Sequence, residues 1–295
     1  MRVTFAEIGG IRTRFFHSGA GDHGVILLHG VGVSADSWFW SLDPLSGGKS
    51  LCVAPDLLGF GMTEDAPGSP DAPPQEAIVD HLVGLIEHLG LQRVTLVGSS
   101  FGSQIACHLY WRIAEKVDRL VLVGCGPALN GPGTLGPMYE QSFDNGIKAM
   151  SEPTLEVCRR RMKNLVHDEA AVPEALLLMQ LTLYGLPATR ERYERRMRGI
   201  MAPAALERYD VTARLDQITI PTLVIWGRHD MRGNFDEAAA SVRRLPAGRM
   251  IVFEDCGHLP YLEHPSKFNA EVSEFMQDAN GKTARLSTAS FSGLR

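Results

Sequence analysis

Short apolar runs bounded by turn residues recur along the chain, and each has the length of a β-strand. The first two runs alternate apolar and polar positions, as strands with one exposed face do. The later runs are continuously apolar, which is typical of strands buried on both faces. We expect eight strands, at residues 3–8, 11–16, 25–28, 51–54, 94–97, 120–123, 222–226 and 250–253.

Longer segments between these runs carry apolar residues at helical spacing. In residues 76–89, for example, Ile78 and Leu82 fall on the same helical stripe, and residues 101–113 and 268–276 show similar patterns. Strands that alternate with helices fold into a mostly parallel sheet covered by helices. The expected fold class is therefore α/β.

The alternation stops between residues 127 and 210, where the sequence is helical in pattern and rich in Met, Leu and Arg. This stretch opens on a Gly- and Pro-rich segment, and Pro221 marks the return of the strand pattern. We expect residues 127–210 to form a helical cap inserted into a core made of residues 1–126 and 211–277. The Ser-, Thr- and Gly-rich residues 278–295 are expected to be a disordered tail.

The composition of the chain limits the classes of molecule that we expect it to bind. The chain has 295 residues and a formal net charge of -5, so we expect no nucleic-acid partner and favour a small neutral or anionic molecule. No apolar stretch reaches the roughly 18 residues needed to span a bilayer, and no leader pattern is visible, so we expect no membrane partner and a cytoplasmic protein. The five cysteines are expected to be core thiols. The sequence leaves open whether the chain forms a homo-oligomer.

Residues 98–102 form a G-x-S-x-G motif between a predicted strand and a predicted helix. A nucleophile elbow needs this context, because glycines beside Ser100 allow the sharp turn that exposes its hydroxyl group. The Phe101 backbone N–H, at the start of the helix, would then face an oxyanion formed beside Ser100. The alternative is a turn with an incidental serine, which the flanking strand and helix disfavour.

A nucleophilic serine needs a base and an orienting acid, which in this arrangement follow in the order Asp or Glu, then His. His258 comes after the last predicted strand and a glycine, at the sheet edge where the elbow lies. Asp230 follows the preceding strand, where a buried carboxylate would fix the histidine tautomer. We therefore expect Ser100 as nucleophile, His258 as general base and Asp230 as the orienting acid.

A glycine-rich turn ends the predicted strand at residues 25–28, in the run V-I-L-L-H-G-V-G. We expect the Val31 backbone N–H to be the second oxyanion donor, beside that of Phe101. His29 lies in the same turn, and we expect it to brace the backbone rather than to take part in catalysis.

Five motifs, in family order and spacing, resemble the α/β-hydrolase superfamily: LLHGVG, APDLLGFGMT, LVGSSFGS, IPTLVIWGRHD and CGHLPYLEHP. The resemblance covers nearly the whole chain. It implies an α/β-hydrolase fold with about eight mostly parallel strands, flanking helices and an inserted helical cap. It also implies the triad Ser100, Asp230 and His258, with Val31 and Phe101 as the oxyanion hole.

Within that superfamily the chain is similar to hydrolases that cleave carbon–carbon bonds in ring-cleavage products of aromatic degradation. That group normally has Asn before the nucleophile and Trp after the histidine, where this chain has Ser99 and Leu259. We therefore expect cleavage of a carbon–carbon bond or of an ester, lactone or amide. Substrate contacts are expected from Gly30, Ser34, Ser99 and Leu259, and from at most one of the many cap arginines.

Two other functions are compatible with this fold: a small-molecule receptor, and a cofactor-independent oxygenase or perhydrolase. A complete Ser, Asp and His set argues against the receptor, and no feature of the sequence demands oxygen chemistry. The cysteines lack C-x-x-C spacing, and residues 46–50 lack the spacing of a phosphate-binding loop. We expect a serine hydrolase with no metal and no cofactor.

Overall fold

The computed structural model describes residues 1–66 and 72–278. Its centre is one sheet of eight strands in the order β1-β2-β4-β3-β5-β6-β7-β8. The β1–β2 and β2–β4 pairings are antiparallel, and the other pairings are parallel. The strands are β1 (Arg2–Ile8), β2 (Ile11–Ser18), β3 (His23–Leu28), β4 (Leu51–Pro55), β5 (Arg93–Ser99), β6 (Val117–Val123), β7 (Thr222–Gly227) and β8 (Gly248–Phe253).

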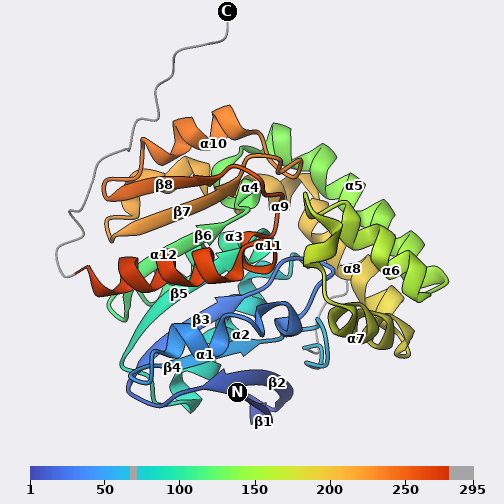
Figure 1. Ribbon diagram of the computed structural model, residues 1–295, viewed down its shortest axis with the longest axis horizontal. Helices are drawn as coiled ribbons and strands as arrows, with labels where there is room; N and C mark the ends of the chain where they lie inside the picture. Colours follow the sequence, from blue (N-terminus) through green and yellow to red (C-terminus); the bar gives the residue numbers. More distant parts are fainter. Residues whose placement is uncertain (67–71, 279–295) are drawn as a thin grey trace, which may run out of the picture.

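Helices cover both faces of this sheet. Helices α1 and α12 contact each other in front of the sheet in Figure 1, whereas α3 contacts α2 and α4, and α4 contacts α10. The core helices are α1 (Leu42–Ser46), α2 (Gln75–His88), α3 (Phe101–Arg112), α10 (Phe235–Val242), α11 (Pro260–Glu263) and α12 (Pro265–Gln277), with a 3-10 turn η1 (Ala35–Trp38). The predicted α/β fold with a mostly parallel sheet is confirmed.

The central strands are buried on both faces, as their continuous apolar runs predict. Val25, Leu96, Leu122 and Ile225 belong to four different strands, and all are fully buried. The alternating β1 lies at the sheet edge, where Val3 is 51% exposed. The hydrophobic pattern therefore distinguishes the edge strand β1 from the centre of the sheet. It does not do so for β8, the other edge strand, because residues 250–253 are continuously apolar but Met250, Ile251 and Val252 are only half-buried.

Between β6 and β7 the described chain contains no strand. The helices of this segment are α4 (Gly126–Leu129), α5 (Pro132–Ser151), α6 (Leu155–Lys163), α7 (Glu174–Gly185), α8 (Thr189–Met201) and α9 (Pro203–Arg208), with 3-10 turns η2 (Glu169–Ala171) and η3 (Thr212–Gln217). Figure 1 shows α5, α6, α7 and α8 gathered on one side of the sheet, and α5 contacts α8 while α6 contacts α7.

The sequence also predicts a disordered tail and no helix that spans a membrane. The tail predicted at residues 278–295 lies, from residue 279 onward, outside the described residues. Among the helices that the structure describes, none has the length and apolar character needed to cross a bilayer.

Candidate active site

Ser100 sits at the junction of β5 and α3, in a backbone conformation that residues other than glycine rarely adopt. Its φ angle is 53° and its ψ angle is -122°. Such a conformation costs on the order of 1–3 kcal/mol and persists only where the surroundings impose it. Here the Ser100 N–H donates to the Val123 carbonyl at 2.9 Å, which holds the turn against β6.

The two glycines of the motif are needed because backbone segments approach them closely. A Cβ atom on Gly98 would lie 2.3 Å from the Gly102 carbonyl oxygen. A Cβ atom on Gly102 would lie 2.3 Å from the Leu28 carbonyl oxygen, at the end of β3. The spacing of these glycines therefore lets the chain turn at Ser100 and lets α3 pack directly against β3.

His258 and Asp230 form a buried pair. The His258 Nδ1 atom lies 3.0 Å from Asp230 Oδ1 and 2.9 Å from Oδ2. His258 is 5% exposed and Asp230 is 8% exposed. Asp230 Oδ1 also accepts a hydrogen bond from the Arg232 backbone N–H at 2.7 Å, which fixes the carboxylate. Because Nδ1 faces the carboxylate, Nε2 is the ring nitrogen available for proton transfer.

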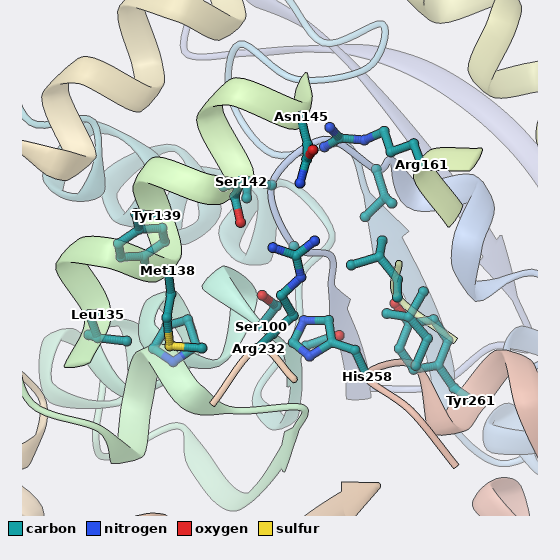
Figure 2. A pocket seen from close by; sticks show the side chains of 17 residues that line it. Ser100, Leu135, Met138, Tyr139, Ser142, Asn145, Arg161, Arg232, His258 and Tyr261 are labelled. Carbon is teal, nitrogen blue, oxygen red and sulfur yellow. The ribbon is translucent and has the colours of Figure 1, made fainter. Parts of the chain in front are cut away.

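One pocket brings these groups together. Ser100 and His258 line it (Figure 2). Four other residues predicted from the sequence also line it: Gly30, Val31, Ser99 and Leu259. The pocket encloses about 700 Å³ of space not occupied by protein atoms, part of which is open solvent. Ser34 instead lines a neighbouring pocket, and its hydroxyl donates to Asp36 at 2.6 Å.

The turn after β3 closes over the elbow. A Cβ atom on Gly30 would lie 2.9 Å from Ser100 Cβ, so Gly30 is in direct contact with Ser100. Val31 follows in the pocket wall, and Phe101 is fully buried as the first residue of α3. Val31 therefore lines the same pocket as Ser100 from the turn after β3, and Phe101 follows Ser100 directly at the start of α3.

His29 braces the same turn. Its Nε2 atom accepts the Leu57 backbone N–H at 3.0 Å, so Nδ1 carries the proton and donates to the Gly30 carbonyl at 2.8 Å. Burial lowers the pKa of His29, which keeps the ring neutral. The expected structural role of His29 is confirmed.

A buried arginine lies in the pocket wall, at a position that the sequence does not single out. Arg161 of α6 is 8% exposed and lines the same pocket as Ser100. Its guanidinium group lies over the rings of Tyr184 and Tyr193, 5.8 Å and 5.9 Å from their centroids. Its Nε atom has no hydrogen-bond partner, and no carboxylate of the described chain forms an ion pair with it. A cation buried in this way favours an anionic ligand.

A second arginine lies in the same pocket. Arg232 is half-buried, and burial together with the neighbouring charge of Arg161 lowers its pKa. Its Nη1 atom donates to Gln141 at 2.9 Å. Figure 2 shows Arg161 and Arg232 projecting into the pocket with Asn145, which also lines it. The pocket therefore combines a serine, an imidazole and two guanidinium groups.

The helical pattern of α6 contains the signal that identifies Arg161. The buried residues of this helix are Cys158, Arg161 and Met162, which share one face, whereas Arg159 and Arg160 are exposed. An arginine on the apolar stripe of a helix must be buried when the helix packs. Four other arginines of the inserted segment form ion pairs with carboxylates: Arg195, Arg196, Arg198 and Arg208.

Comparisons with known proteins identify the family to which the chain is similar. Residues 25–271 match the alpha/beta hydrolase family. The chain is 31% identical over 276 residues to a 2-hydroxy-6-oxononadienedioate/2-hydroxy-6-oxononatrienedioate hydrolase of Paraburkholderia xenovorans (strain LB400), covering 91% of each chain. It is 28% identical to a 2-hydroxy-6-oxo-6-phenylhexa-2,4-dienoate hydrolase of Burkholderia cepacia, covering 95% of this chain and 96% of that one.

A solved structure gives the same result. The chain superposes on a meta-cleavage product hydrolase from Pseudomonas fluorescens IP01, a variant complexed with acetates, with a TM-score of 0.76 and 25% identity. The match covers 94% of this chain and 98% of that one. The chain therefore belongs to the alpha/beta hydrolase family, and it is a hydrolase similar to enzymes named for ring-cleavage products.

Proposed function

We propose that this chain hydrolyses a carbon–carbon bond in an anionic ring-cleavage product, with Ser100 as nucleophile, His258 as general base and Asp230 as the orienting acid. The observation that carries the proposal is the Asp230–His258 pair beside Ser100, in a pocket whose buried Arg161 has no carboxylate partner in the described chain. A serine and an imidazole provide acyl transfer, and the unpaired cation selects an anionic substrate.

The reaction requires one proton acceptor that later becomes a proton donor. His258 Nε2 takes the Ser100 proton as the serine oxygen attacks a ketone carbon, and the Val31 and Phe101 N–H groups stabilise the oxyanion. His258 then protonates the leaving carbon as the carbon–carbon bond breaks. Water, deprotonated by the same imidazole, attacks the acyl-enzyme and releases a carboxylic acid and free Ser100. Each oxyanion donor contributes about 3 kcal/mol to the transition state.

The names of the relatives indicate the substrate class. A 2-hydroxy-6-oxo dienedioate has a carboxylate at each end, an enol near one end and a ketone at the bond to be broken. Arg161, Arg232 and Asn145 offer donors for a carboxylate or an enol oxygen. Transfer of the enol proton to carbon would create a carbonyl that accepts the electrons of the breaking bond. An ester needs no such step, so the two substrate classes differ in their need for these donors.

The remaining expectations follow from this reaction. We propose that residues 127–210 act as a cap over a core of residues 1–126 and 211–277, because α5 and α6 supply Tyr139, Asn145 and Arg161 to the pocket wall. The proposed chemistry uses only side chains and backbone N–H groups, so it requires no cofactor. A small organic acid is the proposed substrate, and the cytoplasm is the proposed compartment.

The decisive assay compares three substrates on the same enzyme. They are a 2-hydroxy-6-oxo dienedioate, an analogue that lacks one of its two terminal carboxylates, and a neutral p-nitrophenyl ester. We expect kcat/KM to be highest for the dienedioate and to vanish for all three substrates in Ser100→Ala. If the enzyme cleaves the ester efficiently but cleaves neither the dienedioate nor its analogue, the result contradicts carbon–carbon cleavage. Ser100 would still be the nucleophile.

Arg161 has a matched control on the same helix. Arg161→Gln should raise KM for the dienedioate by about tenfold to a hundredfold, because a charge-assisted hydrogen bond contributes about 1.5–3 kcal/mol. Arg160→Gln removes an exposed arginine and should change nothing. The KM for the neutral ester should stay the same in both variants. Equal effects of Arg161→Gln on anionic and neutral substrates would show that this arginine supports packing rather than recognition.

A further inference from the structure

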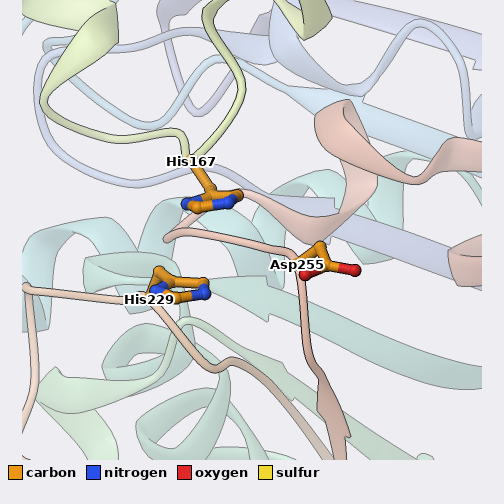
Figure 3. Close-up of side chains that lie close together, drawn as sticks. All are labelled: His167, His229 and Asp255. Carbon is orange, nitrogen blue, oxygen red and sulfur yellow. The ribbon is translucent and has the colours of Figure 1, made fainter.

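Three potential metal ligands meet outside the pocket that Ser100 lines. They are His167, from the loop between α6 and η2, His229, from the loop after β7, and Asp255, from the loop after β8 (Figure 3). One ligand atom of each lies within 4.8 Å of the others, and all three residues are exposed. The two imidazole rings stack, with centroids 4.1 Å apart and planes 11° apart. Three distant segments thus present their side chains to one small volume.

The backbones of these residues are held in place. The His229 N–H donates to the Cys256 carbonyl at 2.9 Å, and the His167 N–H donates to Glu263 Oε2 at 2.6 Å. The Asp255 carbonyl accepts a hydrogen bond from His264 Nε2 at 2.7 Å. Because the three backbones are fixed by separate hydrogen bonds, little chain entropy remains to be lost when the side chains bind a common ligand.

The side chains of these three residues are available to bind a ligand. In the part of the chain that the structure describes, the ring nitrogens of His167 and His229 and the carboxylate of Asp255 make no hydrogen bond. The neighbouring thiol of Cys256 is buried and points to Glu263 Oε1 at 3.5 Å, so it does not belong to the cluster. Two imidazoles and one carboxylate are therefore available to an ion that arrives from solvent.

We propose that His167, His229 and Asp255 bind a first-row divalent transition-metal ion such as Zn²⁺. Imidazole nitrogen suits Zn²⁺, Co²⁺ and Ni²⁺, whereas Mg²⁺ and Ca²⁺ prefer oxygen ligands throughout. Ligand atoms at about 2.0–2.2 Å from Zn²⁺ lie at most about 4.4 Å apart, so tilting the exposed rings by a small rotation closes the site. Water completes the coordination on the exposed side.

The position of the site gives the ion a structural effect. The His258 N–H donates to the Leu165 carbonyl at 2.8 Å, so the loop that carries His167 already contacts the loop that carries the proposed general base. An ion held by His167, His229 and Asp255 adds a further link between the inserted segment and the loops after β7 and β8. Because the folded chain holds these ligands together and the unfolded chain does not, binding raises the melting temperature.

The test measures binding without substrate, so its outcome is independent of the proposed hydrolysis. Untagged, metal-free full-length protein is titrated calorimetrically with ZnCl₂, and its melting temperature is recorded with and without Zn²⁺. We expect one Zn²⁺ per chain and a higher melting temperature. His167→Gln, His229→Gln and Asp255→Asn should each weaken binding by about tenfold or more and reduce the thermal shift.

A matched control uses an exposed histidine elsewhere. His88→Gln, at the end of α2, should bind Zn²⁺ as the wild type does. Co²⁺ titration adds a spectroscopic readout, because imidazole and carboxylate ligands give weak visible bands without thiolate charge transfer. Absence of saturable binding would overturn the proposal, and so would binding that persists unchanged in His167→Gln and His229→Gln. Thiolate charge transfer would place the ion on cysteine and overturn it equally.

Discussion

Ser100 combines a strained backbone with a hydroxyl group that lines the pocket. The positive φ angle of Ser100 would relax if the turn were released, so Gly98 and Gly102 and the hydrogen bond to Val123 impose it. The strained turn exposes the Ser100 hydroxyl group, because it directs the side chain away from the sheet.

Asp230 offers the sharpest test of the triad at the scale of one residue. Asp230→Asn keeps the size of the side chain but favours the wrong tautomer of His258, so kcat should fall by about 10⁴-fold. Steady-state kinetics measures the loss, and circular dichroism with thermal melting verifies that the fold is kept. A variant that keeps more than a tenth of the wild-type kcat would exclude Asp230 as the orienting acid.

The sequence predicts the triad candidates more readily than the arginines of the pocket. Ser100, Asp230 and His258 each follow a predicted strand, and the carboxyl ends of parallel strands lie at one sheet edge. Arg161 lies among arginines of similar local composition, and only packing of α6 separates it from Arg160. A residue whose role depends on how one helix packs cannot be selected by composition alone.

The contact between α3 and β3 determines which residue can stand at position 102. Alanine is normally the better residue inside a helix, but a Cβ atom on Gly102 would collide with the Leu28 and His29 carbonyl oxygens. Gly102→Ala should therefore lower the free energy of unfolding by about 1–3 kcal/mol. Urea denaturation measures this change.

Gly133 is the matched control, because a Cβ atom there would meet nothing within 4 Å in α5. Gly133→Ala should raise the free energy of unfolding by up to about 1 kcal/mol. If the two substitutions have the same effect, the close approach of α3 to β3 does not limit the choice of residue at position 102.

The strands can be predicted from the sequence because each one contains a short apolar run that is visible in the local pattern. All eight predicted runs correspond to β1–β8, and the observed strands extend them by a few residues at most. The short helices α4 and α11 were not predicted, since four residues are too few to show helical periodicity. The cluster of His167, His229 and Asp255 was missed because its ligands come from three separated loops and form no motif.

At the scale of the whole molecule, buried neutral histidines link stability to pH. Burial lowers the pKa of His81 to about 4, and it also lowers the pKa of His29. In the unfolded chain a histidine titrates near pH 6.5, so between pH 6.5 and pH 4 the unfolded state binds protons that the folded state does not. Stability should therefore be constant above this window and fall as pH falls through it.

Urea denaturation at several pH values checks this dependence. Each histidine contributes a slope of up to about 1.4 kcal/mol per pH unit, and His81→Gln should make the decline shallower. His81 Nε2 lies 2.8 Å from the Thr13 hydroxyl, so the substitution also costs some stability at neutral pH. An unchanged slope in His81→Gln would assign the acid sensitivity to other groups.

The layout of the molecule places the proposed catalytic groups just after strands, at one edge of the sheet. Ser100 follows β5, Val31 follows β3, Asp230 follows β7 and His258 follows β8. The inserted helices supply the other wall of the pocket through Arg161 and its neighbours. In the proposed reaction, the core therefore supplies the groups that cleave the bond, and the inserted segment supplies groups that recognise the substrate.

Labelling with a fluorophosphonate probe tests directly whether Ser100 is the nucleophile. The probe reacts with an activated serine, and peptide mass mapping identifies the residue that carries it. We expect labelling confined to Ser100 in the wild type, no labelling in Ser100→Ala, and much slower labelling in His258→Ala. Labelling at another serine, or equal labelling of the wild type and Ser100→Ala, would contradict Ser100 as the nucleophile.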